Sequence, residues 1–227
     1  AGWMIMIKPD PLADLEFTRG IVERISARGD VITPMEETLA RESIRELLDA
    51  GVESITISLM HSYADPTHEQ RLKAMIQDMG GDIPVSLSSE LLPEFREYER
   101  TLVTVMNAYV RPSMGRYLKG FEEKLRSIQF SPKVNIVRSD GGLMSVAKAS
   151  ESPVHTMLSG PAGGVSGAAY LATLAGYPNA LGFDMGGTST DVSLIQDGAP
   201  TQSRQTQLGY YPVKVPSVEV HSVGAGG

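Results

Sequence analysis

The stretch from Ala180 to Ile195 constrains the fold more than any other, because two apolar segments flank a turn with almost no side-chain bulk. Residues 180–183 and 192–195 are predicted to form short strands. Between them, Gly186 and Gly187 free the backbone to take positive φ and to approach another group closely. The sequence therefore predicts a strand, a glycine turn and a second strand.

The chemistry of this turn suits an anion. Its backbone amides and the hydroxyls of Thr188, Ser189 and Thr190 converge on a small space, which is one way that proteins hold phosphate oxygens. Asp184 and Asp191 bracket the turn, and bare carboxylates would repel phosphate. A Mg²⁺ ion that keeps several waters and bridges to phosphate resolves this conflict. The alternative is a tight hairpin whose Asp and Thr residues only satisfy turn backbone.

Composition limits the classes of function. A chain of 227 residues can form one large or two small domains. The net charge of −7 argues against a nucleic-acid or anionic-membrane surface. The chain has no Cys, which excludes disulfides and thiolate metal sites, and no apolar run of the ~20 residues that span a bilayer. We expect a cytoplasmic protein without nucleic-acid or membrane partners.

The two ends favour a piece of a longer polypeptide. The chain begins Ala-Gly-Trp without an initiator Met and stops in the glycine-rich run Val223-Gly-Ala-Gly-Gly227. Gly224, Gly226 and Gly227 could make a second glycine-rich approach to a ligand, or the run could be a linker.

Residues 1–92 are predicted to form a small α/β unit, because helical and strand patterns alternate there. The expected elements are a helix over 12–27, a helix from the N-cap Thr33 to about residue 50, a strand over 52–60, a helix that starts after Asp65-Pro66, and a strand over 83–87.

Residues 93–130 are predicted to be two linking helices, interrupted at Arg111-Pro112. The first is strongly charged from Glu94 to Arg100, and pairs such as Glu97 with Arg100 at three-residue spacing favour a solvated helix face.

Residues 131–227 are predicted to carry the site. A helix that starts at Pro161 places Gly160, Gly163 and Gly164 near its N-terminus. Each Gly inside a helix costs about 0.5–1 kcal/mol relative to Ala, so close packing or ligand approach is the expected reason for them. A helix N-terminus also favours anions. Asp140, in an Asp-Gly-Gly sequence, is predicted to be a turn residue first and a site residue second.

Several common nucleotide and metal motifs are absent. No Gly-x-x-x-x-Gly-Lys-Ser/Thr P-loop occurs, the segment after Gly160 departs from the dinucleotide-binding pattern, and the four His residues show no zinc-binding spacing.

The order of motifs resembles the hydantoinase A and 5-oxoprolinase family. It consists of a GPAGGV helix start at Gly160, the sequence DMGGTSTDV from Asp184, and VGAGG from Val223. The upstream sequences LMHSYADPTHE from Leu59, PEFREYERT from Pro93 and NAYVRP from Asn107 extend the similarity over most of the chain.

This resemblance implies half of a ribonuclease-H-like, actin-like ATPase fold, similar to sugar kinases and heat-shock chaperones. It implies Mg-ATP as cofactor and an ATP-dependent opening of a cyclic amide. Residues 186–190 would form the second phosphate loop, Asp184 and Asp191 would be catalytic and hold Mg²⁺, the glycines from Gly160 would lie beneath the nucleotide, and Gly224, Gly226 and Gly227 would begin the adenosine loop. A missing N-terminal lobe and a hydantoinase B-type subunit would be partners.

Two alternatives stay open. Related family members are ATP-dependent ketone carboxylases, and a nucleotide-gated binding or assembly module would use ATP without cleaving an amide. The family's first phosphate loop, Asp-x-Gly-Gly-Thr-Phe-Thr-Asp, does not occur in these 227 residues, so the chain alone is expected to be inactive.

Overall fold

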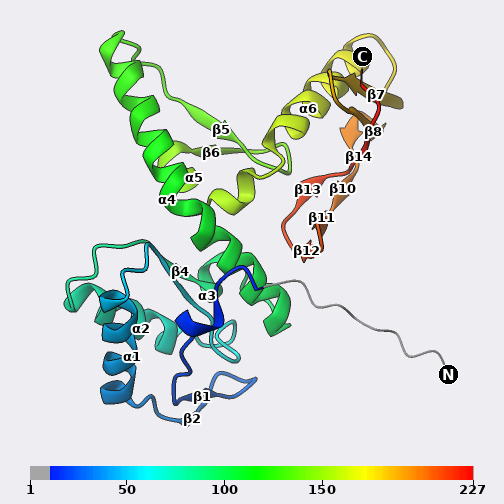
Figure 1. Ribbon diagram of the computed structural model, residues 1–227. Coiled ribbons are helices and arrows are strands. Elements are labelled where there is room, and N and C mark those ends of the chain that lie inside the picture. Colours follow the sequence, from blue (N-terminus) through cyan, green and yellow to red (C-terminus); the bar gives the residue numbers. More distant parts are fainter. Residues whose placement is uncertain (1–10, 227) are drawn as a thin grey trace, which may run out of the picture. The chain divides into compact units, whose positions relative to one another are not determined.

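The computed structural model describes residues 11–226 and divides into two compact units (Figure 1). Unit 1 comprises Ala1–Pro112 with Leu208–Tyr211, and unit 2 comprises Ser113–Gln207 with Pro212–Gly227. Gly227, which was predicted to bind nucleotide, lies outside the described residues. The predicted boundaries at residues 92 and 130 stay predictions.

Unit 1 is a small α/β structure, as predicted. Its elements are η1 (Leu15–Phe17), β1 (Arg24–Ile25), β2 (Val31–Thr33), α1 (Glu37–Asp49), β3 (Ile55–Ile57), α2 (Thr67–Asp78), β4 (Val85–Leu87), α3 (Ser88–Leu91) and the start of α4 (Glu97–Ser127). β3 and β4 pair in parallel, with α2 between them in the chain, and β1 pairs antiparallel with β2.

The core of unit 1 lies between this parallel pair and the two helices α1 and α2. The two strands contribute alternate apolar residues, and α1 and α2 contribute apolar residues at helical spacing; the buried set is Ala40, Ile44, Ile55, Ile57, Leu72, Met75, Ile76, Val85 and Leu87. The predicted strands and the helix after Asp65-Pro66 are confirmed. Asp65 accepts a hydrogen bond from the Thr67 amide at 2.9 Å, which fixes the start of α2.

Two predictions for the first 36 residues were wrong. The expected helix over 12–27 is only the turn η1 followed by β1, because Gly20 interrupts the apolar pattern and β-branched residues follow it. Thr33 is not an N-cap, since it pairs with Arg24 in the β1–β2 hairpin. α1 therefore begins at Glu37 without a side-chain cap.

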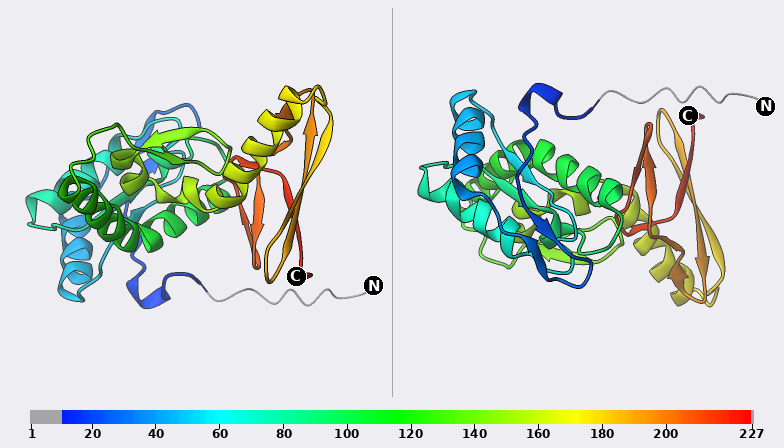
Figure 2. Two further views of the ribbon diagram at one scale, coloured as in Figure 1. Left: turned by 90° about the horizontal axis from the view of Figure 1, so that it is seen from above. Right: turned by 90° about the horizontal axis from the view of Figure 1, so that it is seen from below.

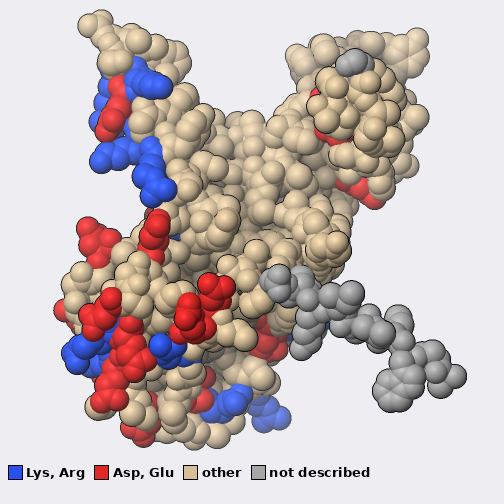
Figure 3. All heavy atoms as spheres, in the orientation of Figure 1, with Lys and Arg blue, Asp and Glu red and all other residues tan. Residues whose placement is uncertain are grey.

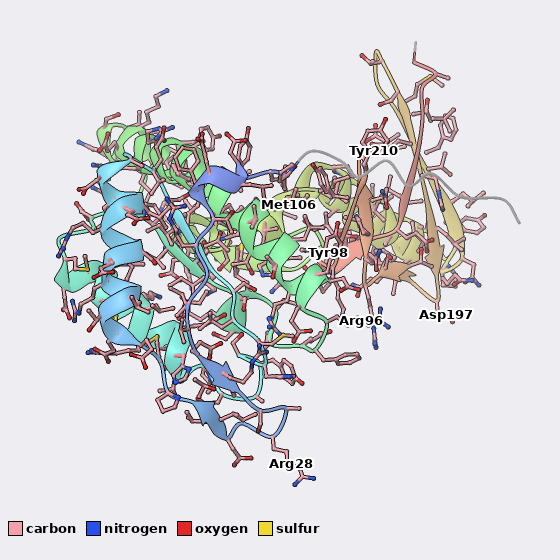
Figure 4. All side chains as sticks on the ribbon, turned by 60° about the horizontal axis from the view of Figure 1, so that its bottom comes forward. Arg28, Arg96, Tyr98, Met106, Asp197 and Tyr210 are labelled. Carbon is pink, nitrogen blue, oxygen red and sulfur yellow. The ribbon has the colours of Figure 1, made fainter. Side chains whose placement is uncertain are left out.

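α4 corrects the expected break at Arg111-Pro112, because it runs through Pro112 without interruption. A proline inside a helix removes the hydrogen bond to the carbonyl four residues earlier, here that of Ala108. The hydroxyl of Ser54 donates to this carbonyl at 2.9 Å, so the acceptor is satisfied from outside the helix. Figure 4 labels Arg96 and Tyr98 at the start of this helix and Met106 further along it.

The charged start of α4 is only partly a solvated face. The expected pairs exist, with Arg96 to Glu99 at 3.3 Å and Arg100 to Glu97 at 3.7 Å. Arg100 itself is fully buried, however, and its guanidinium donates to the Leu59 carbonyl at 2.6 Å. The prediction of solvation was therefore wrong for Arg100.

Unit 2 begins with the rest of α4 and continues into a largely antiparallel structure. Its elements are β5 (Asn135–Val137), β6 (Leu143–Ser145), α5 (Val146–Glu151), η2 (Pro153–Thr156), α6 (Ser159–Leu174), β7 (Ala180–Met185), β8 (Thr190–Gln196), β9 (Ala199–Pro200), β10 (Gln202–Ser203), β13 (Ser217–Val218) and β14 (Val220–Val223). The hairpin strands β11 (Thr206–Leu208) and β12 (Tyr211–Val213) belong to unit 2 except for Leu208 and Tyr211.

The central sheet of unit 2 has the strand order β14-β8-β7, and each neighbouring pair is antiparallel. The views of Figure 2 show α6 alongside the long β7–β8 hairpin. A Cβ added at Gly182 in β7 would lie 3.9 Å from Cβ of Ala168 in α6, so small residues allow this close contact. The predicted helix near Pro161 and the strands around Gly186 are confirmed.

Candidate functional site

The tip of the β7–β8 hairpin is the predicted phosphate loop. The two strands stay in register up to the pair Met185 and Thr190, and the Gly186 amide donates to the Ser189 carbonyl at 2.9 Å across the turn. Gly186, Gly187 and Thr188 are exposed, so their backbone can be reached from outside the sheet. Neither Gly186 nor Gly187 takes positive φ, so the expectation of positive φ was wrong. Close approach of another group to the backbone is the remaining reason for glycine at these two positions.

The two aspartates of the hairpin face each other. Asp184 and Asp191 are direct partners across β7 and β8, so their side chains project from the same face of the sheet, with Cβ atoms roughly 5 Å apart in such pairs. Like charges directly opposite destabilise a sheet. A cation between them would remove this penalty.

No basic side chain from the surrounding sequence can supply that cation. Residues 149–203 contain neither Lys nor Arg. Figure 3 accordingly shows no Lys or Arg on the visible surface over α6 and the hairpin. A phosphate bound here would depend on backbone amides, hydroxyls and a metal ion.

The glycine-rich tail packs onto the tip of the hairpin. The Thr190 hydroxyl donates to the Ala225 carbonyl at 2.6 Å. A Cβ added at Gly226 would lie only 2.5 Å from the Gly187 carbonyl carbon, whereas one at Gly224 would meet nothing within 4 Å. Residues 224–226 and the predicted phosphate loop, distant in sequence, are therefore adjacent in space, and only glycine fits at residue 226 as the backbone stands.

The glycine-rich start of α6, the third segment predicted to contribute to the site, also lies near the β7–β8 hairpin. A Cβ added at Gly164 would lie 3.6 Å from the Asp184 carboxylate, so the helix backbone lies close to the acidic pair. At Gly160, Gly163 and Gly167 an added Cβ would meet nothing within 4 Å. These three glycines border open space, and their role in ligand binding stays a prediction.

The chemistry of the donor set fits Mg²⁺. Mg²⁺ prefers oxygen ligands, keeps several waters and is commonly held by one or two carboxylates together with substrate phosphates. Asp184 and Asp191 supply two carboxylates at an accessible edge. Among residues 11–226, no cluster of three or more His, Asp or Glu side chains is suited to a metal ion, so water and phosphate would complete the coordination.

Sequence reasoning missed Ser222 as a site residue. It lies opposite Asp191 in the β14–β8 pairing, and its hydroxyl donates to the Asp191 carboxylate at 2.5 Å. The only sequence signal was its position next to the glycine run, which does not distinguish it from other serines.

Asp140 is a turn residue, as predicted. Its carboxylate accepts a hydrogen bond from the Gly142 amide at 2.9 Å and pairs with Arg138 at 2.7 Å. Nearby, burial and then the Arg138 charge lower the pKa of His155 below its ordinary value. These surroundings therefore favour the neutral form of the His155 imidazole. His155 lies in η2 and not at the tip of the β7–β8 hairpin.

Comparison with known protein families assigns both parts of the chain to one family. Residues 100–227 match the Hydantoinase/oxoprolinase family, and residues 3–80 match the Hydantoinase/oxoprolinase N-terminal region. The chain therefore belongs to the hydantoinase/oxoprolinase family.

Three relatives show the range of this family. The chain is 36% identical to the acetone carboxylase beta subunit of Xanthobacter autotrophicus, in a match that covers 95% of the present chain. It is 38% identical to 5-oxoprolinase 1 of Arabidopsis thaliana, in a match that covers 87% of the present chain. The crystal structure of the ATP-dependent caprolactamase from Pseudomonas jessenii matches the whole chain with a TM-score of 0.89 at 31% identity. The α/β fold class is confirmed.

The chain spans a third or less of these proteins. It covers 30% of the acetone carboxylase subunit, 15% of the 5-oxoprolinase and 33% of the caprolactamase chain. In the described part of the chain, no helix combines the length and apolar character needed to cross a membrane.

Proposed function

We propose that this chain is part of an ATP-dependent enzyme that opens cyclic amides, with an actin-like ATPase lobe in unit 2. The observation that carries the proposal is the convergence of the Asp184–Asp191 pair, the exposed glycine turn and the glycine-rich tail at one end of a hairpin. The relatives named 5-oxoprolinase and caprolactamase support an amide substrate.

The residues have separate roles in this proposal. The Gly187 amide with the Thr188 and Ser189 hydroxyls would bind phosphate oxygens of ATP, and Gly186, whose amide closes the turn onto the Ser189 carbonyl, would leave room for their close approach. Asp184 and Asp191 would hold a hydrated Mg²⁺, which supplies charge neutralisation for the phosphates.

Phosphoryl transfer would make a poor electrophile reactive. A phosphate placed on the amide oxygen makes the amide carbon more electrophilic, and water can then add to that carbon. The ring opens when the C–N bond breaks and the nitrogen leaves as a protonated amine, which gives an acyl phosphate. A second water releases the phosphate and leaves the open-chain carboxylate. The residue that activates the water would come from elsewhere in the full-length protein.

The experiment is an ADP-release assay on the full-length protein that contains this chain. The substrates would be 5-oxoproline, a hydantoin and caprolactam, with ATP alone as the blank. We expect release above the blank with at least one cyclic amide. Release that is equally fast without any amide would contradict the hydrolase proposal and favour a nucleotide-gated module.

Asp184→Asn tests the site within this assay. We expect it to abolish amide-dependent turnover, because the amide side chain is a poor Mg²⁺ ligand and carries no charge. Asp197→Asn is the matched control, since Asp197 is exposed in the turn after β8, at the other end of that strand, as labelled in Figure 4. Turnover retained by the Asp184 variant would remove this residue from the mechanism.

A second candidate function is ATP-dependent carboxylation of a ketone within a multi-subunit enzyme. The similarity to an acetone carboxylase subunit over nearly the whole chain favours it. ADP release that requires both a ketone and bicarbonate, and that appears only with a partner subunit, would support this function over amide hydrolysis. We expect no turnover from the 227 residues alone in either case, because they lack the family's first phosphate loop.

A further inference from the structure

Two hydroxyl groups connect the glycine-rich tail to the hairpin from opposite sides of β8. Thr190 and Asp191 are neighbours in an extended strand, so their side chains point to opposite faces of the sheet. The Thr190 hydroxyl donates to the Ala225 carbonyl at 2.6 Å, and Asp191 accepts from the Ser222 hydroxyl at 2.5 Å. Residues 222–225 are therefore held on both faces.

The Ser222 hydrogen bond determines how one carboxylate is presented. Ser222 occupies one oxygen of Asp191, so the other oxygen is left for a ligand on the side of Asp184. Mg²⁺ requires near-octahedral geometry, and hydrogen bonds to a ligating carboxylate orient it. Because Ser222 is exposed, its hydroxyl contributes little to core packing.

The Thr190 contact has a different consequence. Thr190 was predicted to bind phosphate, yet it is buried at 3% exposure and its hydroxyl proton is directed to the tail. The tail at Gly226 then packs directly against the Gly187–Thr188 peptide bond. The Thr190 hydrogen bond thus helps to fix the distance between the two glycine-rich segments.

We propose that Ser222 and Thr190 are positioning residues of the nucleotide site: Ser222 orients the Asp191 carboxylate toward the metal, and Thr190 fixes residues 223–226 against the phosphate loop. This inference rests on the proposed function, because it requires that Mg-nucleotide binds at this tip. Neither residue contacts the reacting atoms in this account.

The first test measures ADP binding to the full-length protein by calorimetry while the Mg²⁺ concentration is varied. We expect Ser222→Ala to raise the Mg²⁺ concentration for half-maximal binding about three- to tenfold, with the unfolding temperature of the free protein unchanged. Ser222→Thr keeps the hydroxyl and should restore the Mg²⁺ dependence. Ser203→Ala is the matched control, because the Ser203 hydroxyl makes its hydrogen bonds within its own turn, with the backbone of Gln205.

The second test is Thr190→Val, which keeps the shape and removes the hydroxyl. We expect ADP affinity to fall about three- to tenfold with no change in the Mg²⁺ dependence, and Thr190→Ser to recover most of the loss. An ADP affinity that Thr190→Val leaves unchanged, or a loss that Thr190→Ser does not recover, would contradict the role of Thr190. If Thr190→Val does not fold, Thr190→Ala takes its place in the same comparison with Thr190→Ser.

The outcomes separate the two levels of the proposal. Absence of Mg-ADP binding by the wild-type protein contradicts the proposed function and the inference with it. Wild-type binding that Ser222→Ala leaves unchanged in both affinity and Mg²⁺ dependence contradicts only the positioning role. A loss that Ser222→Thr does not restore also contradicts it, because the hydroxyl is then not the group that matters.

Discussion

Replacing Glu69 by Gln should destabilise unit 1 strongly, although the two side chains have the same shape. Glu69 is fully buried, and its carboxylate accepts four hydrogen bonds. One oxygen accepts from the Leu59 amide at 2.9 Å and the Ser88 hydroxyl at 2.6 Å. The other accepts from the Ser89 amide at 2.9 Å and the Ser89 hydroxyl at 2.7 Å.

The magnitude follows from these donors. A Gln side chain has one acceptor oxygen, so its NH₂ group must face either the Leu59 or the Ser89 amide. A backbone donor left unsatisfied in the interior costs roughly 1–3 kcal/mol. The other bonds lose their charge-assisted character, since the acceptor becomes neutral. We therefore expect the free energy of unfolding to fall by about 3 kcal/mol.

Urea unfolding of the 227-residue chain, followed by circular dichroism, measures this change. Glu90→Gln is the matched control, because Glu90 is half-exposed and its pair with Lys73 spans 3.3 Å at the surface. Such exposed pairs contribute at most about 1 kcal/mol. If Glu69→Gln changed the free energy of unfolding no more than Glu90→Gln, the argument for a buried network of hydrogen bonds would be refuted.

Three further changes test other parts of the structure. Burial lowers the pKa of His155, so as the pH falls the imidazole is protonated in the unfolded chain before it is protonated in the folded chain, and the free energy of unfolding should decrease below about pH 6.5. His155→Phe should remove this part of the pH dependence of the urea midpoint. Gly164→Ala, whose methyl would contact the Asp184 carboxylate, should weaken Mg-ADP binding by the full-length protein, whereas the control Gly120→Ala in α4, whose methyl would meet nothing within 4 Å, should leave the affinity unchanged; equal affinities of the two variants would contradict the close approach of α6 to the acidic pair. Ser54→Ala should cost about 1 kcal/mol in urea unfolding, because Pro112 leaves the acceptor of that hydroxyl unpaired; an unchanged midpoint would remove Ser54 as the explanation of the unbroken helix.

Sequence patterns predicted those helices, strands and turns whose structure depends on residues that are close together in the chain. The strands around Gly186, the helix near Pro161 and the start of α2 at Asp65-Pro66 depend on residues within a few positions of each other. The sequence also predicted that Asp184 and Asp191 belong together, because a hairpin makes neighbours of residues on its two strands.

Contacts between distant residues could not be predicted in the same way. α4 continues through Pro112 because Ser54 satisfies a carbonyl that lies 54 residues away in the chain. Arg100 is buried because loops far from it in sequence supply acceptors such as the Leu59 carbonyl. Ser222 meets Asp191 across 31 residues, and no local pattern marks that hydroxyl.

Hydrogen–deuterium exchange of the full-length protein, with and without a non-hydrolysable ATP analogue and Mg²⁺, tests the central claim most directly. We expect slower amide exchange in residues 184–191 and 222–226 when both the analogue and Mg²⁺ are present, and a smaller effect when Mg²⁺ is left out. Nucleotide-dependent protection elsewhere, with these two segments unchanged, would contradict it.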